Sequence, residues 1–319
     1  MLLEYKERKN AIMFFIKNKN KKKNNQQKVD TTKVKIPTIN DKEKLTEEYI
    51  IVGFLSWAKY GYEIYENIEQ YPRWTSYKLH LDNPKLKHQE LVKNGYLIPA
   101  STEFTLGKCK VSQLKEILND HNLNANGKKD DLIERIVNNV DIYSIKLPKY
   151  YVLSAKGESF LKDHEDLVSV YYNKYDISEY EYITTKATMT DYCKVNDVFW
   201  RIFQIRYDNY FKSQDWGLLR NVECNRAIFL QEEKKYKDAL YHFILVTYYD
   251  LSGCGNNNRI ESKENAVAAP SILNNIHELG EYYDEIMIDR CYKNYLPHHY
   301  LNKEVFRTYI KKIIKNDYT

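Results

Sequence analysis

The residues from Val111 to Val140 constrain the fold most, because they hold two helical apolar patterns separated by turn-forming residues. In each pattern, apolar side chains recur at the spacing that places them on one face of a short helix. The first face is Val111, Leu114, Ile117 and Leu118, and the second is Leu132, Ile133, Ile136 and Val137. Either helix alone would be marginal in water. We therefore expect the two to pack together, with Leu123 from the intervening loop between them.

Gly127, Lys128 and Lys129 precede the second pattern, so its helix is expected to begin near Lys128 with its free N–H groups facing outward. This arrangement resembles the SAP domain, a helix–extended loop–helix module that binds DNA in its family. The resemblance implies contacts to the DNA backbone from Lys115, Gly127, Lys128, Lys129 and Arg135. It implies a module core of Val111, Leu114, Leu118, Leu123, Leu132, Ile133 and Ile136.

The segment departs from the family pattern in two ways. Lys110 stands where the family often has a Thr or Ser that caps the first helix, and Asp130 and Asp131 reduce the positive potential beside the lysines. Residues 107–140 contain six Lys/Arg and five Asp/Glu, a net charge of +1. Few phosphates can be neutralised, so we expect weak, salt-sensitive, non-specific binding to double-stranded DNA. The alternative is a helical hairpin used for folding or protein contact.

Residues 1–46 carry the basic charge of the chain. They hold thirteen Lys/Arg against five Asp/Glu, a net of +8, so the remainder is 5 − 8 = −3. We expect a disordered, solubilising tail; the alternative is a segment that touches an anionic membrane or nucleic acid. The apolar run at 11–16 is far too short for a transmembrane span, and no small-residue cleavage site follows it.

No pattern in the chain predicts catalysis. We find no phosphate-cradling glycine loop and no nucleophile elbow, so we expect no enzyme, no catalytic residues and no cofactor. The five cysteines are scattered singly, and His298-His299 has no carboxylate at ligand spacing, so no metal site is expected. Unpaired cysteines fit a reducing cytoplasm.

Residues 47–106 and 141–170 are expected to form one helical domain interrupted by the module at 107–140. A helix is predicted from Glu47 to about Glu69, with Gly61 as a position that breaks or bends it, and a second from Asn83-Pro84 to Asn94. Strands are predicted at 96–98 and 150–153, and Ser154 is expected to cap the helix that follows. This order resembles a winged helix with the module inserted at the tip of the wing. The alternative is a linear string of small helices.

The C-terminal half is predicted to be helical. Residues 171–194 are poorly periodic and are interpreted as a connector with a short helix. Within 195–319, Ala227, Tyr236, Ala239 and Phe243 have the spacing of a tetratricopeptide-like (TPR-like) helical hairpin. The whole layout is similar to bacterial and phage-type SAP-domain proteins.

These features predict a mainly α, multi-domain chain that serves as a non-enzymatic, DNA-associated adaptor. In this hypothesis the SAP-like module contacts DNA, and the helical C-terminal half binds an unidentified protein partner. The competing hypothesis is a protein-interaction scaffold in which the SAP-like hairpin is purely structural.

Overall fold

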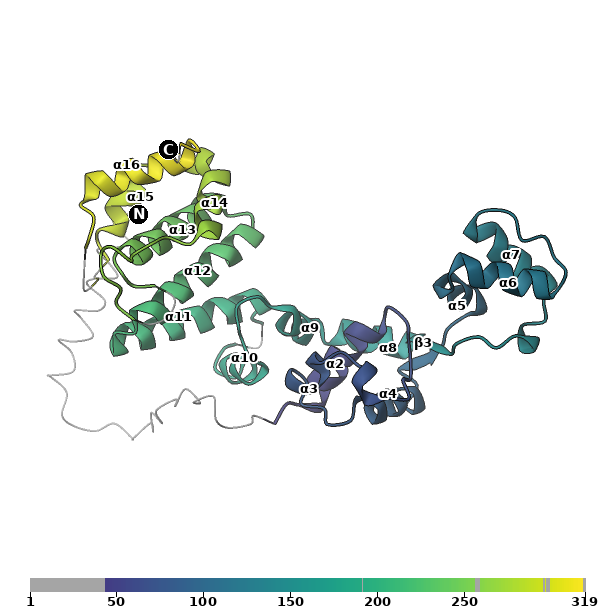
Figure 1. The fold of residues 1–319 in the computed structure, drawn as a ribbon. Helices are drawn as coiled ribbons and strands as arrows, with labels where there is room; N and C mark the ends of the chain where they lie inside the picture. The colour runs from purple at the N-terminus through teal and green to yellow at the C-terminus, as the bar shows by residue number, and fades with distance from the viewer. Residues whose placement is uncertain (1–43, 191, 256–258, 295, 297–298, 318–319) are drawn as a thin grey trace, which may run out of the picture. The chain divides into compact units, whose positions relative to one another are not determined.

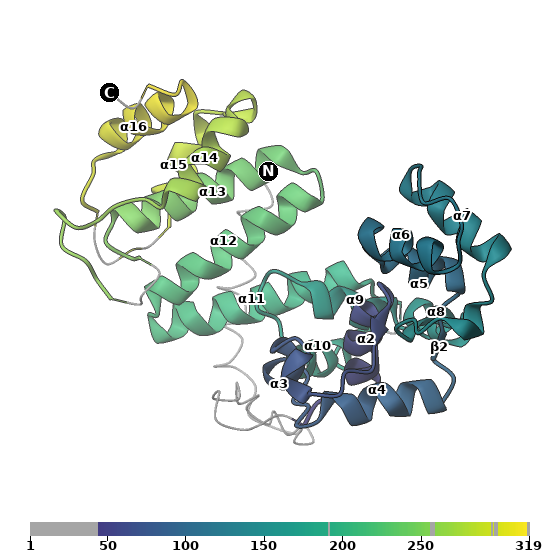
Figure 2. The same ribbon diagram turned by 45° about the vertical axis from the view of Figure 1, so that its right-hand side comes forward.

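The structure is a computed structural model, and it describes residues 44–190, 192–255, 259–294, 296 and 299–317. All but the last three residues of the predicted tail, 1–46, therefore lie outside the described residues, as does His298. The described part of the chain is mainly helical, which confirms the predicted fold class (Figures 1 and 2).

The first described helix, α2 (Glu47–Ala58), begins where the sequence predicts and ends much earlier. Thr46 caps it, because its side-chain oxygen accepts a hydrogen bond from the Tyr49 N–H at 3.2 Å. The helix was predicted to reach about Glu69, but the chain turns at Gly61, which has a φ of +77°. The ring of Phe104 packs so closely there that a Cβ on Gly61 would lie 2.3 Å from its Cζ atom. The short elements that follow are β1 (Tyr62–Glu63), η1 (Ile68–Gln70) and α3 (Trp74–Tyr77).

A small antiparallel sheet holds the two ends of the inserted module. Its strand order is β1-β3-β2, where β2 is Leu97–Pro99 and β3 is Tyr150–Leu153. Leu97 pairs with Leu153, and Pro99 pairs with Tyr151. Residues 100–149, which contain the SAP-like module, therefore interrupt a pair of neighbouring strands, the arrangement predicted for an insertion in a wing.

Helices pack around this sheet. Before β2, α4 (Pro84–Lys93) starts at the predicted Asn83 cap, whose side chain accepts from the Leu86 N–H at 3.2 Å. After β3, Ser154 caps α8 (Ala155–Asp163), and α9 (Glu165–Tyr172) follows directly. Buried residues of α2, α4 and α9 share one apolar core with β2 and β3.

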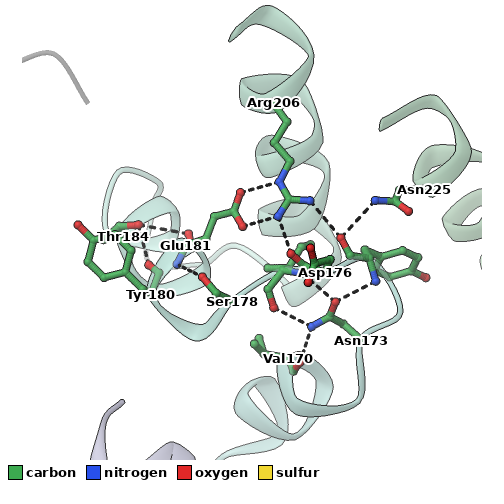
Figure 3. Close-up of polar contacts among 11 residues, drawn as sticks. Val170, Asn173, Asp176, Ser178, Tyr180, Glu181, Thr184, Arg206 and Asn225 are labelled. Atoms are coloured by element: carbon green, nitrogen blue, oxygen red, sulfur yellow. Dashed lines mark hydrogen bonds and ion pairs between the residues drawn. The ribbon is translucent and has the colours of Figure 1, made fainter. Parts of the chain in front are cut away.

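The segment predicted as a connector, 171–194, packs into that core instead. Figure 3 shows Arg206 reaching across to it: the guanidinium donates to the Glu181 carboxylate at 2.6 and 2.7 Å and to the Tyr175 and Asp176 carbonyls at 3.0 and 2.6 Å. The segment contains α10 (Glu179–Lys186), and the Tyr182 ring is buried with its hydroxyl donating to Asp166 at 3.2 Å. Tyrosine rings bury apolar area while a bonded hydroxyl avoids the desolvation cost, so weak periodicity did not mean an unpacked linker.

The C-terminal half is built from packed helices. In Figure 1, α11 (Val195–Ser213), α12 (Trp216–Glu232) and α13 (Tyr236–Leu251) lie side by side. The remaining elements are α14 (Pro270–Glu278), η3 (Gly280–Tyr282), α15 (Ile286–Cys291) and α16 (Lys303–Ile314). Ala227, Ala239 and Phe243, which carry the predicted hairpin spacing, are fully buried. The small side chains of Ala227 and Ala239 let α12 and α13 approach closely.

The α12–α13 pair also encloses charged groups. The Arg220 guanidinium binds both carboxylate oxygens of Asp250, at 2.8 and 2.9 Å, and the two side chains are only 8% and 4% exposed. The Glu223 carboxylate lies between His242 and Arg226, at 2.5 and 2.9 Å. Because each buried charge has a partner, the cost of desolvating it is offset.

Candidate nucleic-acid interface

Three helices form the SAP-like module: α5 (Thr102–Lys108), α6 (Val111–Asp120) and α7 (Lys129–Asn139). They enclose an apolar core of their own, in which every buried member except Cys109 is aliphatic. Its buried members are Leu106, Cys109, Leu114, Leu118, Leu132, Ile136 and Val140. Leu123 and Ile133, predicted as core residues, are half-buried against this cluster.

Val111 was predicted to be a core residue of the module, and this prediction is wrong. It continues the apolar spacing of α6, but its side chain is 42% exposed. It is the first residue of α6, and the neighbouring end of the core is closed by Leu106 and Cys109 of the preceding segment. The periodic pattern could not reveal this because α5 lies outside it.

At the start of α7, no N-cap side chain accepts from the first turn of the helix, and the Asp131 carboxylate lies beside it. Gly127 has a φ of +130°, a conformation that favours glycine, and Lys128 follows it in the extended N-cap position. The Lys128 backbone N–H donates to Asp131 Oδ2 at 3.0 Å. A lysine side chain has no acceptor, so it cannot satisfy the first N–H groups of the helix as Ser, Thr or Asp would. The N–H groups left without a partner and the positive end of the helix dipole therefore lie beside the exposed Lys128, an arrangement that suits a phosphate, while Asp130 and Asp131 in the first turn reduce the local positive potential.

The start of α6 repeats this arrangement close by. Lys110 occupies its N-cap position, and the Lys110 backbone N–H donates to Gln113 Oε1 at 2.8 Å. Lys129 links the start of α7 to the last turn of α5, because its ammonium donates to the Gly107 carbonyl at 2.6 Å. The charge of Lys129 also reaches Cys109: burial raises the pKa of that thiol, and Lys129 partly offsets the rise. Both α6 and α7 thus begin with a lysine at the N-cap position, and the Lys129 side chain reaches the chain just before α6, at Gly107 and Cys109.

The predicted contact residues divide into two groups. Gly127, Lys128 and Lys129 come together at the start of α7, and Lys115 is exposed on α6. Arg135 lies in the second turn of α7, where its guanidinium donates to two carbonyls of the loop before the helix; Lys129 is also bonded within the module, to one carbonyl of α5.

Lys110 was not among the predicted contact residues. Its position before the first apolar face was visible in the sequence, where it counted only as a missing cap. The signal that would have found it is the match between Lys110 and Lys128, since both stand at the N-cap of a module helix.

Among the residues that the structure describes, no group of three or more His, Cys, Asp or Glu side chains is arranged to hold a metal ion. Within those residues, no helix has the length and apolar character needed to cross a membrane.

Comparison with known families identifies this module. Residues 105–141 match the family model of the SAP domain. The match spans α5 to α7, so it includes the helix that supplies Leu106 to the core. No curated protein and no solved structure matches the chain significantly.

Proposed function

We propose that this protein is a non-enzymatic, DNA-associated adaptor of the cytoplasm, whose SAP module contacts the backbone of double-stranded DNA. The observation that carries the proposal is that two helices of a module that matches the SAP family begin with a lysine at the N-cap, Lys110 and Lys128, and that Lys129 reaches the chain just before the first of these helices. Uncapped helix starts leave N–H donors for phosphate oxygens, and the lysines add mobile positive charge.

The contact is weak and indifferent to base sequence. With three or four phosphates neutralised, the slope of log K against log salt concentration is about −3, following roughly −0.9 per phosphate. Sequence readout in the major groove depends largely on bidentate side chains such as arginine on guanine. Arg135 is the only arginine of residues 105–141, and its guanidinium is already bonded to loop carbonyls.

The C-terminal half serves as the protein-binding part of this adaptor. Its support is the close α12–α13 hairpin with buried Ala227 and Ala239, the packing used by TPR-like repeats. The layout also fits the bacterial and phage-type SAP-domain proteins that the sequence resembles. The competing function is a scaffold whose SAP module is structural only, and its support is the low net charge of the module, +1 over residues 107–140.

Binding of labelled duplexes to the protein truncated to begin at Lys44, without most of the basic residues of 1–46, separates these two functions. Lys128→Ala with Lys129→Ala should weaken binding to duplexes of different sequence by the same factor. The matched control is Lys312→Ala with Lys315→Ala, which removes the same charge from exposed positions at the end of α16. If the two double variants bind alike, the module is not the DNA contact and the scaffold function replaces the adaptor.

A further inference from the structure

The loop between α6 and α7 is held by the helix that follows it. The Nη1 atom of Arg135, in the second turn of α7, donates to the carbonyl oxygens of Asn124 and, at 3.0 Å, Asn126. The loop adds a bond of its own, in which the Asn126 N–H donates to Asn124 Oδ1 at 2.9 Å. One guanidinium therefore spans the residues that lead directly into Gly127.

Asp131 fixes the other end of this loop. It lies one helical turn before Arg135, and its carboxylate accepts the Lys128 N–H at 3.0 Å. The same carboxylate packs over Gly127, where a Cβ would lie 3.0 Å from Oδ2. Asp131 and Arg135 thus hold the loop from successive turns of α7, and only Leu123 and Ala125 of the loop pack on the apolar core.

We propose that Arg135 is a positioning residue of the DNA interface and not a phosphate ligand. Its guanidinium holds the carbonyls of Asn124 and Asn126, which sets the direction in which the chain enters α7. The N–H groups at the start of α7 and the Lys128 ammonium are thereby arranged before DNA arrives, so binding costs less ordering entropy. This inference rests on the proposed DNA contact.

Two substitutions in the full chain separate positioning from phosphate contact. Arg135→Lys keeps the charge but loses the planar fork, and Arg135→Gln loses both. Positioning predicts that both variants bind duplex DNA about five- to tenfold more weakly, the worth of one or two hydrogen bonds. It also predicts that both keep the wild-type slope of log K against log salt. A phosphate ligand predicts the opposite: Lys retains affinity and slope, while Gln makes the slope shallower by about 0.9. That result overturns the proposal.

Amide hydrogen exchange provides a readout that needs no DNA. In both variants, exchange at Asn126, Gly127 and Lys128 should accelerate, while the core amides of Leu118 and Leu132 keep wild-type protection. Unchanged exchange in the loop, or lost protection at the core amides, contradicts a positioning role. If the wild type and the Lys128→Ala, Lys129→Ala variant bind DNA alike, the proposed function fails, while the exchange experiment still shows whether Arg135 holds the loop.

Discussion

Leu118→Ala tests whether the SAP module is held together by the small core described above. Leu118 is fully buried in α6 among the few aliphatic side chains that join α5, α6 and α7. Truncating a buried leucine removes its transfer free energy and leaves a cavity, at a cost of about 2–5 kcal/mol. α6 and α7 have only 10 and 11 residues, so neither helix is stable without this packing. The loss should therefore appear as local opening of the module rather than unfolding of the whole chain.

Amide hydrogen exchange on the full chain measures this opening directly. Protection should fall across residues 102–140 and remain unchanged in α12 and α13, which belong to a different core. Val111→Ala is the matched control: it truncates another aliphatic residue of α6, but one that is 42% exposed, so its cost should stay within about 0.5 kcal/mol. Native protection in Leu118→Ala, or equal effects of the two substitutions, would refute this account of the core.

Two further predictions concern the rest of the chain. Arg220→Met should destabilise the protein in urea by about 3–5 kcal/mol, because Asp250 would stay buried without its counter-charge; adding Asp250→Leu should recover most of the loss. Burial lowers the pKa of His88 from 6.5 to about 4, so the folded state binds this proton less readily than the unfolded state. The unfolding free energy should therefore fall as pH drops from about 6.5 to about 4, and His88→Phe should make that fall smaller. If the variant and the wild type lose the same free energy over this pH range, the lowered pKa of His88 is contradicted.

Local signals predicted the elements whose boundaries depend on nearby residues. The Asn83-Pro84 start of α4 and the Ser154 cap of α8 are made by side chains within three residues of the helix. The two strands that flank the module, β2 and β3, were also predicted from their own residues, at 96–98 and 150–153. They pair because the chain on either side of the insertion returns to one sheet.

Long-range contacts decided what the sequence could not predict. The burial of 171–194 depends on Arg206 and on tyrosine hydroxyls that donate to carboxylates. In the candidate interface, Lys128 and Lys129 could be predicted as a pair of cations because they are adjacent in the sequence. The hydrogen bonds of Arg135 within the module could not be predicted, because their acceptors are backbone carbonyls, which every residue has.

The salt dependence of DNA binding tests the central claim most directly. The protein should be truncated to begin at Lys44, the first described residue, because twelve of the thirteen Lys/Arg of residues 1–46 precede it and would otherwise dominate the binding. The slope of log K against log salt should be about −3, and Lys128→Ala with Lys129→Ala should bring it to about −1 while weakening all duplexes equally. A slope that these two substitutions leave unchanged would contradict the claim that the start of α7 contacts DNA.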